Sequence, residues 1–166
     1  MLSVQRGDKK AFEVLFSRYK APIWSFLNRY GRDHEATSEL YQEVFLNVWK
    51  GANTYKAGQK VRPWLYRIAN NSARDRYRKS TRTVETQPFE DFHPDQIVDP
   101  IGSVDLERAI AALPDTLRSA FILGTIEGLN HQEVAAALDI SPANARARIS
   151  RARVALRQRL IEEQNA

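Results

Sequence analysis

The stretch from Asn130 to Arg159, NHQEVAAALDISPANARARISRARVALRQR, constrains the fold of this chain more than any other. Asn130, with Glu133 three residues later, predicts a helix that begins with a capping box. Ser141 followed by Pro142 predicts a second helix after a turn of about three residues. Two helices joined in this way form a helix-turn-helix, in which the second helix enters the major groove of DNA.

Periodicity alone also fits an ordinary helical hairpin with a solvated basic face. DNA binding is favoured because six arginines lie between residues 142 and 159, with no acidic residue among them. A helix that needs only to be solvated usually alternates Glu with Arg four residues apart. Asp139 stands in the turn where Gly is usual, but Asp tolerates a left-handed backbone. The sequence therefore predicts a helix-turn-helix.

Charge and composition divide the chain into three parts. Residues 1–82 carry a net charge of +10 and residues 106–166 one of +1, whereas 83–105 contain six acidic and no basic residues. The segment 83–102 holds three prolines and no sustained hydrophobic period, as linkers do. We therefore predict an all-α protein of two small helical domains, 1–82 and 103–166, joined by an acidic flexible linker at 83–102. Two basic blocks of this kind indicate two polyanion-binding modules.

The first domain is predicted to begin with a helix from Asp8 to about Gly31, which Pro22 interrupts or restarts. A second helix, 33–49, has an apolar core line and an opposite polar face, which periodicity alone assigns to solvent. The glycine-containing segment 51–60 is predicted to be a loop.

A basic helix is predicted to follow this loop from Arg62 onward. Aromatic and basic residues together suit single-stranded nucleic acid, because rings stack on exposed bases while cations hold the phosphates. Alternatively, Trp64 and Tyr66 are core residues, and the basic end of the helix only interacts with the helix dipole. For Trp64 the core interpretation is favoured.

Composition also argues against several classes of protein. The chain has no cysteine, hence no disulfide framework and no thiolate metal site. No apolar run approaches the ~18 residues that span a bilayer, and the N-terminus lacks an apolar signal core. His34, His93 and His131 lack metal-ligand spacing, and no phosphate-binding glycine pattern occurs. We expect a cytoplasmic protein that is not an enzyme, with no cofactor, metal or small-molecule substrate.

Three segments then carry a resemblance that covers nearly the whole chain. LYQEVFLNVWK (40–50), RPWLYRIANNSARDRYRK (62–79) and the stretch 113–160 resemble, in order and separation, a bacterial extracytoplasmic-function (ECF, group IV) sigma factor. The resemblance implies a σ2-like domain at 1–82 and a σ4-like domain at 103–166. It implies that the chain directs core RNA polymerase to promoters by recognising −10 and −35 elements and assisting strand opening. On the same grounds, the resemblance implies an anti-sigma factor as a partner.

The resemblance also implies three groups of site residues. The polar face of helix 33–49 would dock on the β′ clamp coiled coil through Glu39, Gln42, Glu43 and Asn47. Asn71 matches the family's base-contacting Asn and Trp64 its aromatic residue; the full set for the −10 element is Tyr55, Lys56, Lys60, Arg62, Trp64, Asn71, Arg74, Arg76, Arg78 and Lys79. The second domain would contact the β flap and read the −35 element, with Asn144, Arg146 and Ser150 facing bases and Arg148, Arg151 and Arg153 mainly on phosphates.

Several residues depart from the family pattern. Pro63 replaces a usually non-proline residue, which the first helical turn tolerates, and Ala147 and Ser150 are small where side chains of other members reach bases. Ser72 and Arg74 stand at commonly apolar positions, so we expect that helix to pack less tightly or to present a different surface. Ala145 replaces a usual Val in the recognition helix, which would weaken its packing.

Two other functions remain open. A stand-alone helix-turn-helix repressor or activator would explain 130–159 but would leave 40–50 and 51–82 without a role. A nuclease or transposase fragment would need clustered carboxylates for metal ions, and Asp75 is the only acid in the basic helix.

Overall fold

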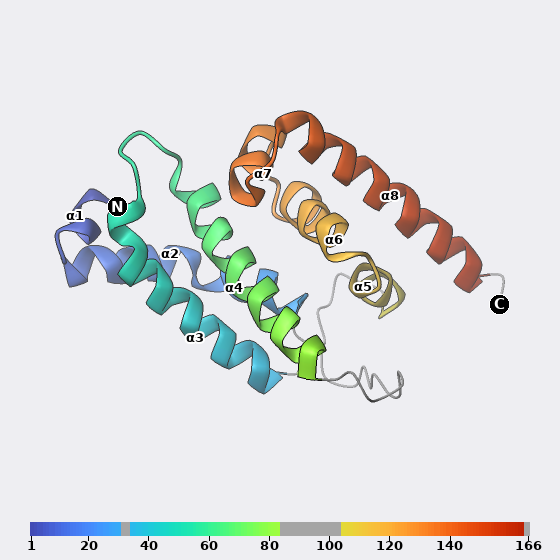
Figure 1. The fold of residues 1–166 in the computed structure, drawn as a ribbon, viewed down its shortest axis with the longest axis horizontal. Helices are drawn as coiled ribbons and strands as arrows, with labels where there is room; N and C mark the ends of the chain where they lie inside the picture. Colours follow the sequence, from blue (N-terminus) through green and yellow to red (C-terminus); the bar gives the residue numbers. More distant parts are fainter. Residues whose placement is uncertain (31–33, 84–103, 165–166) are drawn as a thin grey trace.

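The computed structural model describes residues 1–30, 34–83 and 104–164, and within these ranges every regular element is a helix (Figure 1). The all-α prediction is thus confirmed, while the predicted linker lies outside the described residues except for Thr83. The elements are α1 (Leu2–Gln5), α2 (Lys9–Asn28), α3 (His34–Lys50), the 3₁₀ helix η1 (Gly51–Thr54), α4 (Val61–Thr83), α5 (Val104–Ala111), α6 (Asp115–Phe121), the π-helical turn η2 (Ile122–Ile126), α7 (His131–Leu138) and α8 (Pro142–Gln164).

The first half of the chain packs α2, α3 and α4 against one another. Asp8 caps α2, because its carboxylate accepts a hydrogen bond from the Ala11 amide at 3.1 Å. Pro22 lies inside α2, which continues to Asn28, so the prediction that Pro22 interrupts this helix is wrong. The turn after the proline buries Ile23 and Phe26 completely. We infer that this burial offsets the hydrogen bond that proline cannot make.

α3 and α4 meet along the predicted core line of α3. Leu40, Val44 and Val48 are all buried there. The predicted loop 51–60 begins with the 3₁₀ turn η1, and Gln5 anchors it by donating to the carbonyls of Ala52 at 3.0 Å and Tyr55 at 2.6 Å. The loop therefore starts from a fixed position beside the N-terminus of the chain.

The second half of the chain is organised around a buried arginine on α6. Arg118 donates to the carbonyls of Ile110 at 3.3 Å, Ala111 at 2.5 Å and Leu113 at 2.8 Å. These carbonyls lie at and just after the end of α5, where a helix has no N–H donors of its own for its last carbonyls. Arg118 therefore fixes the angle between α5 and α6.

The helix-turn-helix forms as predicted. The Asn130 side chain accepts from the Glu133 amide, and the Glu133 carboxylate accepts from the Asn130 amide, both at 3.0 Å, which confirms the capping box. Asp139 adopts the left-handed conformation with φ 55° and ψ 51°. Ser141 Oγ accepts from the Asn144 amide at 3.2 Å and so caps α8. The turn is thus specified by local sequence.

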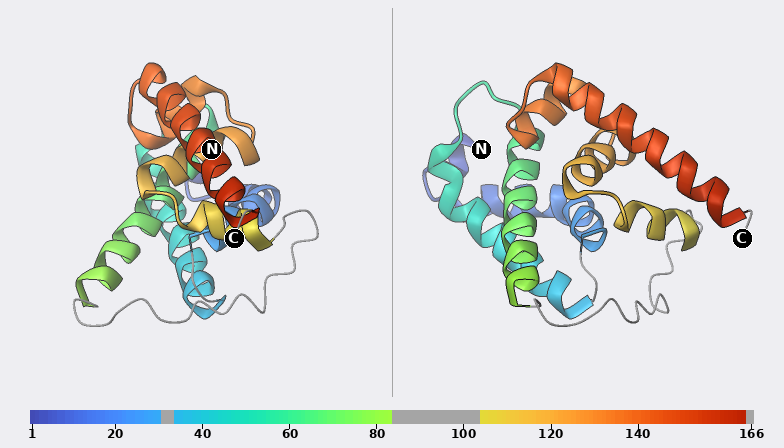
Figure 2. Two further views of the ribbon diagram at one scale, coloured as in Figure 1. Left: turned by 90° about the vertical axis from the view of Figure 1, so that its right-hand side faces the viewer. Right: turned by 45° about the vertical axis from the view of Figure 1, so that its right-hand side comes forward.

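The two halves pack against each other where α7 meets the N-terminal end of α4 (Figures 1 and 2). Their buried apolar side chains form one contiguous cluster that runs from Leu15 in the first half to Leu156 in the second. Arg29, at the end of α2, also lies 3.5 Å from the Glu107 carboxylate of α5. The two halves therefore form a closed arrangement, in which they pack against each other and the two predicted DNA-reading segments are neighbours.

Candidate nucleic-acid interface

Where α4 packs against α7, basic side chains of the first half form ion pairs with acidic side chains of the second half. Lys60 Nζ lies 2.8 Å from Glu133 Oε1, and an Arg62 guanidinium nitrogen lies 3.8 Å from Glu127 Oε2. Arg62 also donates to the Glu127 backbone carbonyl, and the Tyr66 hydroxyl donates to the Glu127 carboxylate. We call these five residues the acidic seam. Both of its cations, Lys60 and Arg62, belong to the predicted −10 set.

Hydrogen bonds and burial within the acidic seam shift the pKa values of two of its residues. The hydrogen bond from Lys60, followed by that from the Asn130 amide, lowers the pKa of Glu133. Burial, followed by the hydrogen bond to Glu127, raises the pKa of Tyr66. The seam is therefore most stable with Glu133 ionised and Tyr66 protonated.

A buried polar cluster holds the two halves together below this seam. Tyr30 just after α2, Asn70 of α4 and Ser119 of α6 are each at least 93% buried. Ser119 Oγ donates to Asn70 Oδ1 at 2.9 Å, Tyr30 Oη donates to the same oxygen at 3.3 Å, and Tyr30 and Ser119 share a further hydrogen bond. Burial raises the pKa of Tyr30 to about 12. These contacts join three segments that are far apart in the sequence: the end of α2, α4 and α6.

The predicted −10 residues differ in accessibility. Lys56, Lys60, Asn71 and Arg74 are exposed, whereas Tyr55 and Trp64 are buried and pack edge to face with ring centroids 5.6 Å apart. Trp64 thus occupies a core position in this arrangement, as the alternative interpretation held. Arg78 and Lys79 lie in α4, beyond the residues whose side chains the structure describes.

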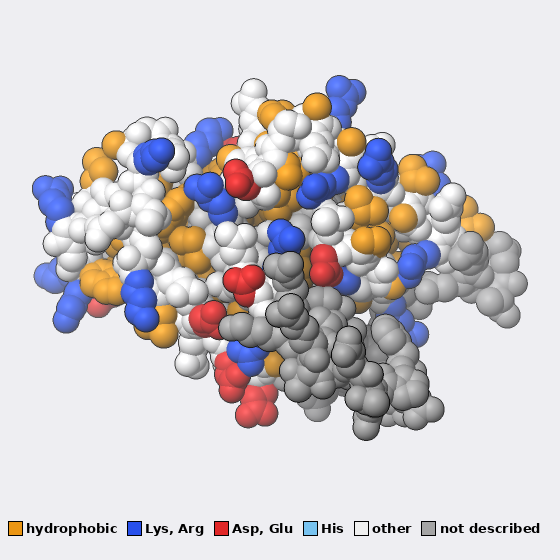
Figure 3. Space-filling model, in the orientation of Figure 1, with side chains coloured by type: hydrophobic (Ala, Val, Ile, Leu, Met, Phe, Trp, Pro, Cys, Tyr) orange, Lys and Arg blue, Asp and Glu red, His pale blue; other side chains and the backbone are white. Residues whose placement is uncertain are grey.

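The predicted polymerase-docking face of α3 is exposed at Glu39, Gln42 and Glu43. Asn47 is half-buried and donates to Ser72 Oγ of α4 at 3.2 Å. Ser72 thereby finds a polar partner at a position where the family commonly has an apolar residue. Figure 3 shows the acidic side chains over the lower part of α3.

Two features of this face were not predicted from the sequence. Glu39 forms an ion pair with Arg76 of α4, which links a predicted polymerase contact to a predicted −10 contact. Leu46 is 57% exposed on the same stretch of α3. The exposure of Leu46 could have been predicted from the sequence, because this leucine lies outside the core line of Leu40, Val44 and Val48.

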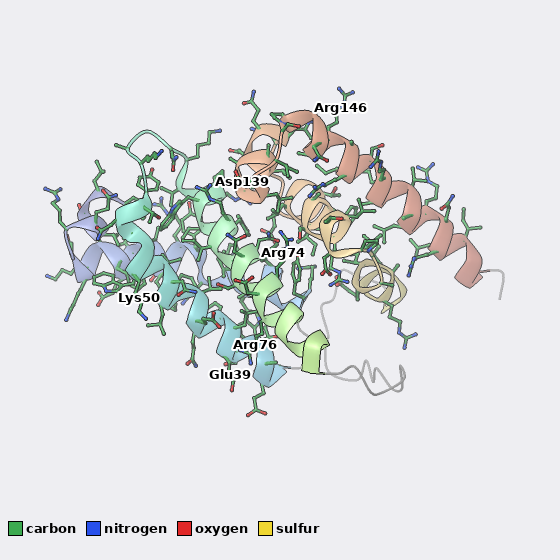
Figure 4. All side chains as sticks on the ribbon, viewed as in Figure 1. Glu39, Lys50, Arg74, Arg76, Asp139 and Arg146 are labelled. Atoms are coloured by element: carbon green, nitrogen blue, oxygen red, sulfur yellow. The ribbon has the colours of Figure 1, made fainter. Side chains whose placement is uncertain are left out.

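The predicted −35 residues line α8. Arg146, Ser150, Arg151 and Arg153 are exposed, and Figure 4 shows Arg146 pointing away from the body of the protein. Asn144 Oδ1 accepts a hydrogen bond from Arg148 Nε at 3.1 Å. On the inner side Ala145 is fully buried, so the small residue is accommodated within the core of this half.

A cavity of about 680 Å³ lies between the two halves. One wall comes from η1 and α4, the other from α6, the helix-turn-helix turn and α8. Figure 4 labels two of the lining residues, Arg74 on α4 and Asp139 in the turn between α7 and α8. The lining residues are Thr54, Trp64, Arg67, Ile68, Asn71, Arg74, Thr116, Leu138, Asp139, Ile140 and Arg148.

Two absences can be stated for the described residues. They contain no group of three or more His, Asp and Glu side chains placed to hold a metal ion. None of the helices in this part of the chain is both long and apolar enough to cross a membrane.

Comparisons with known proteins bear on both halves. Residues 15–83 match the family Sigma-70 region 2, and residues 103–156 match Sigma-70, region 4. The chain is 30% identical over 169 residues to the ECF RNA polymerase sigma-E factor of Escherichia coli (strain K12). It is 29% identical over the same length to the RNA polymerase sigma-H factor of Pseudomonas aeruginosa. Both matches cover 92% of this chain and 88% of the relative.

Two solved structures share the fold. The sigma factor RpoE in complex with the anti-sigma factor NepR, from Bartonella quintana, gives a TM-score of 0.76 at 24% identity and covers 91% of this chain and 97% of that one. CnrH in complex with the cytosolic domain of CnrY gives 0.75 at 22% identity and covers 97% and 94%. The closed placement of the two halves thus belongs to a known fold.

Proposed function

Since the chain belongs to the extracytoplasmic-function (ECF) sigma factors, which direct promoter-specific transcription initiation, we propose how its residues divide that task. The observation that carries the proposal is the presence of two basic reading segments on one chain: the segment from η1 to α4, and α8. Neither a stand-alone repressor nor a nuclease accounts for both.

The first reading segment binds the −10 element as its strands separate. Lys56, Lys60, Arg62, Arg74, Arg76, Arg78 and Lys79 hold phosphates, and Asn71 contacts a base. Its exposure on α4 supports this role, because an amide can donate to and accept from a base edge. Tyr55 and Trp64 support the base-contacting surface from within, and they reach DNA only if the loop 55–60 moves on binding.

The second reading segment binds the −35 element through the major groove. Asn144, Arg146 and Ser150 face base edges, and Arg148, Arg151 and Arg153 position the helix on phosphates. The exposure of Arg146 and Ser150 on the outer face of α8 supports the division. This half of the protein also contacts the β flap of the polymerase.

The polymerase docks on α3. Glu39, Gln42 and Glu43 provide a charged surface for the β′ clamp coiled coil, Asn47 lies beside them, and the exposed Leu46 adds an apolar contact. The centre of a protein interface is more apolar than its polar rim, and Leu46 would supply such apolar area here. The ion pair between Glu39 and Arg76 must rearrange if both residues are used at once.

Opening of the closed arrangement is the step that makes the chain competent. Lys60 and Arg62 are engaged by Glu133 and Glu127, and Asn71 faces the interdomain cavity. Promoter contact by these residues therefore requires the two halves to separate. The protein has an anti-sigma partner that binds before this opening. Two structural relatives in complexes of that kind support this part of the proposal.

Run-off transcription with core RNA polymerase tests the proposal. Arg146→Glu is expected to abolish transcription from a promoter that depends on its −35 element while leaving core binding intact. Loss of core binding as well would refute the division of roles. A gel shift separates the rival function, because a repressor binds its operator alone whereas a sigma factor needs core polymerase.

A further inference from the structure

The interdomain cavity differs from the rest of the domain contact in how its charges are matched. Around it, Lys60 pairs with Glu133, Arg62 with Glu127 and Arg29 with Glu107. Each pair joins a cation of the first half to an acid of the second. These three ion pairs between the halves thus each match opposite charges.

Inside the cavity the charges are not matched in this way. Arg67 and Arg74 of α4 and Arg148 of α8 all line it, and Asp139 is the only acid in the lining. In the described part of the chain none of the three arginines forms an ion pair with a carboxylate; Arg148 donates only to the amide oxygen of Asn144. Closing the two halves therefore brings like charges together around an open space. An anion in that space would relieve the repulsion.

The shape and the apolar part of the lining narrow the chemistry of that anion. About 680 Å³ falls within the range of pockets that hold small ligands. Ile68 and Ile140 stand on opposite walls and are only half-buried, so each leaves apolar surface for a ring. Guanidinium groups match phosphate oxygens in pairs of parallel hydrogen bonds. A ligand that carries both phosphates and a flat ring is a nucleotide.

We propose that the cavity between α4 and the helix-turn-helix binds a nucleoside polyphosphate. Its phosphates lie among Arg67, Arg74 and Arg148, and its base lies against Ile68 and Ile140. Because the arginines come from both halves, the ligand binds the closed form and not the open one. Binding therefore stabilises the closed form by mass action and delays release of the −10 segment. This last consequence rests on the proposed function, whereas the binding itself does not.

Titration calorimetry with the full chain at physiological salt tests the site, with ATP, GTP, inorganic triphosphate and adenosine as probes. Saturable binding of one nucleotide per chain is expected, weaker binding of triphosphate, and none of adenosine. Arg67→Gln should weaken nucleotide binding about tenfold, since an arginine–phosphate contact is a charge-assisted hydrogen bond. Arg67→Lys should fall between the two, because it keeps the charge and loses the paired geometry.

Arg159→Gln is the matched control, since Arg159 is an exposed arginine of α8 outside the cavity. It should leave the affinity unchanged, and thermal melts of all three variants should overlay that of the parent protein. Binding that does not saturate, an equal loss in Arg67→Gln and Arg159→Gln, or preference for hexaglutamate over nucleotide would overturn the proposal. Arg67 has no assigned promoter contact, so transcription by Arg67→Gln without nucleotide separates failure of this site from failure of the proposed function.

Discussion

Replacing Glu127 by Gln tests whether the acidic seam holds the two halves together. The Glu127 side chain is 9% exposed and receives both the Tyr66 hydroxyl and Arg62. Gln keeps the size and one acceptor oxygen but removes the charge. The backbone carbonyl of residue 127 still accepts from Arg62 in the variant, so the change isolates the carboxylate.

The magnitude follows from these contacts. A hydrogen bond to a charged group contributes about 1 kcal/mol more than a neutral one. The Arg62 pair is 3.8 Å long and its guanidinium is 39% exposed, so screening limits its share to about 0.5 kcal/mol. We therefore expect the opening equilibrium to shift by about 1.5 kcal/mol, or roughly tenfold.

Thiol labelling measures this shift, because the chain has no cysteine of its own. Ser119 is 2% exposed and contacts Asn70 across the domain boundary, so Ser119→Cys places one thiol where only opening exposes it. When closing is faster than labelling, the labelling rate is proportional to the opening equilibrium. The rate should rise about tenfold on adding Glu127→Gln.

Two controls decide what such a rise means. Glu13→Gln, at an exposed position of α2, should leave the labelling rate unchanged. Ala145→Cys places a thiol inside the second half, where separation of the halves does not expose it. An equal acceleration at that position would mean that Glu127→Gln unfolds the domain, and an unchanged rate at Ser119→Cys would refute the role of the seam.

Three further predictions follow. Glu133→Gln should retain the capping box and lose only the ion pair with Lys60, whereas Glu133→Ala should lose both; the difference in unfolding free energy should be about 1 kcal/mol, and identical thermal melts would contradict the cap. Asp139→Gly should raise the unfolding free energy by about 1 kcal/mol in denaturant titration, because Gly adopts φ 55° without strain, and a loss of stability would show that the Asp139 side chain has a stabilising role. The closed form should weaken at both ends of a pH titration in which the Ser119→Cys labelling rate is divided by that of the denatured chain at the same pH, because the thiolate is the reactive form. The lowered pKa of Glu133 makes its contribution complete above its ordinary value of 4.5 and lost at lower pH. The raised pKa values of Tyr66 and Tyr30 make theirs complete below 10.0 and lost as pH rises, through about 12 for Tyr30, so a flat ratio would contradict the assigned contacts.

Local features of the fold were predictable because nearby residues determine them. The Asn130 capping box and the left-handed Asp139 depend on contacts within a few residues, and the core line of α3 is visible in the hydrophobic period of that helix. The prediction for Pro22 was wrong because it used local preference alone. Burial of Ile23 and Phe26 against distant helices decides that the helix continues.

The candidate site was predictable in its residues but not in its arrangement. Nothing in the spacing of Lys60, Arg62, Glu127 and Glu133 indicates that they pair, because more than 60 residues separate the partners. The same holds for the cavity, whose arginines come from both halves. Such contacts depend on how two domains are placed, which periodicity and charge counts do not report.

The most direct test of the central claim varies the spacing between promoter elements. Once a promoter is found, insertion of about five base pairs between its −10 and −35 elements turns one by half a helical turn relative to the other. If one chain reads both elements while core polymerase fixes their distance, run-off transcription should be lost although each element is intact. Transcription that is indifferent to this insertion, or tight binding to either element without polymerase, would contradict the account.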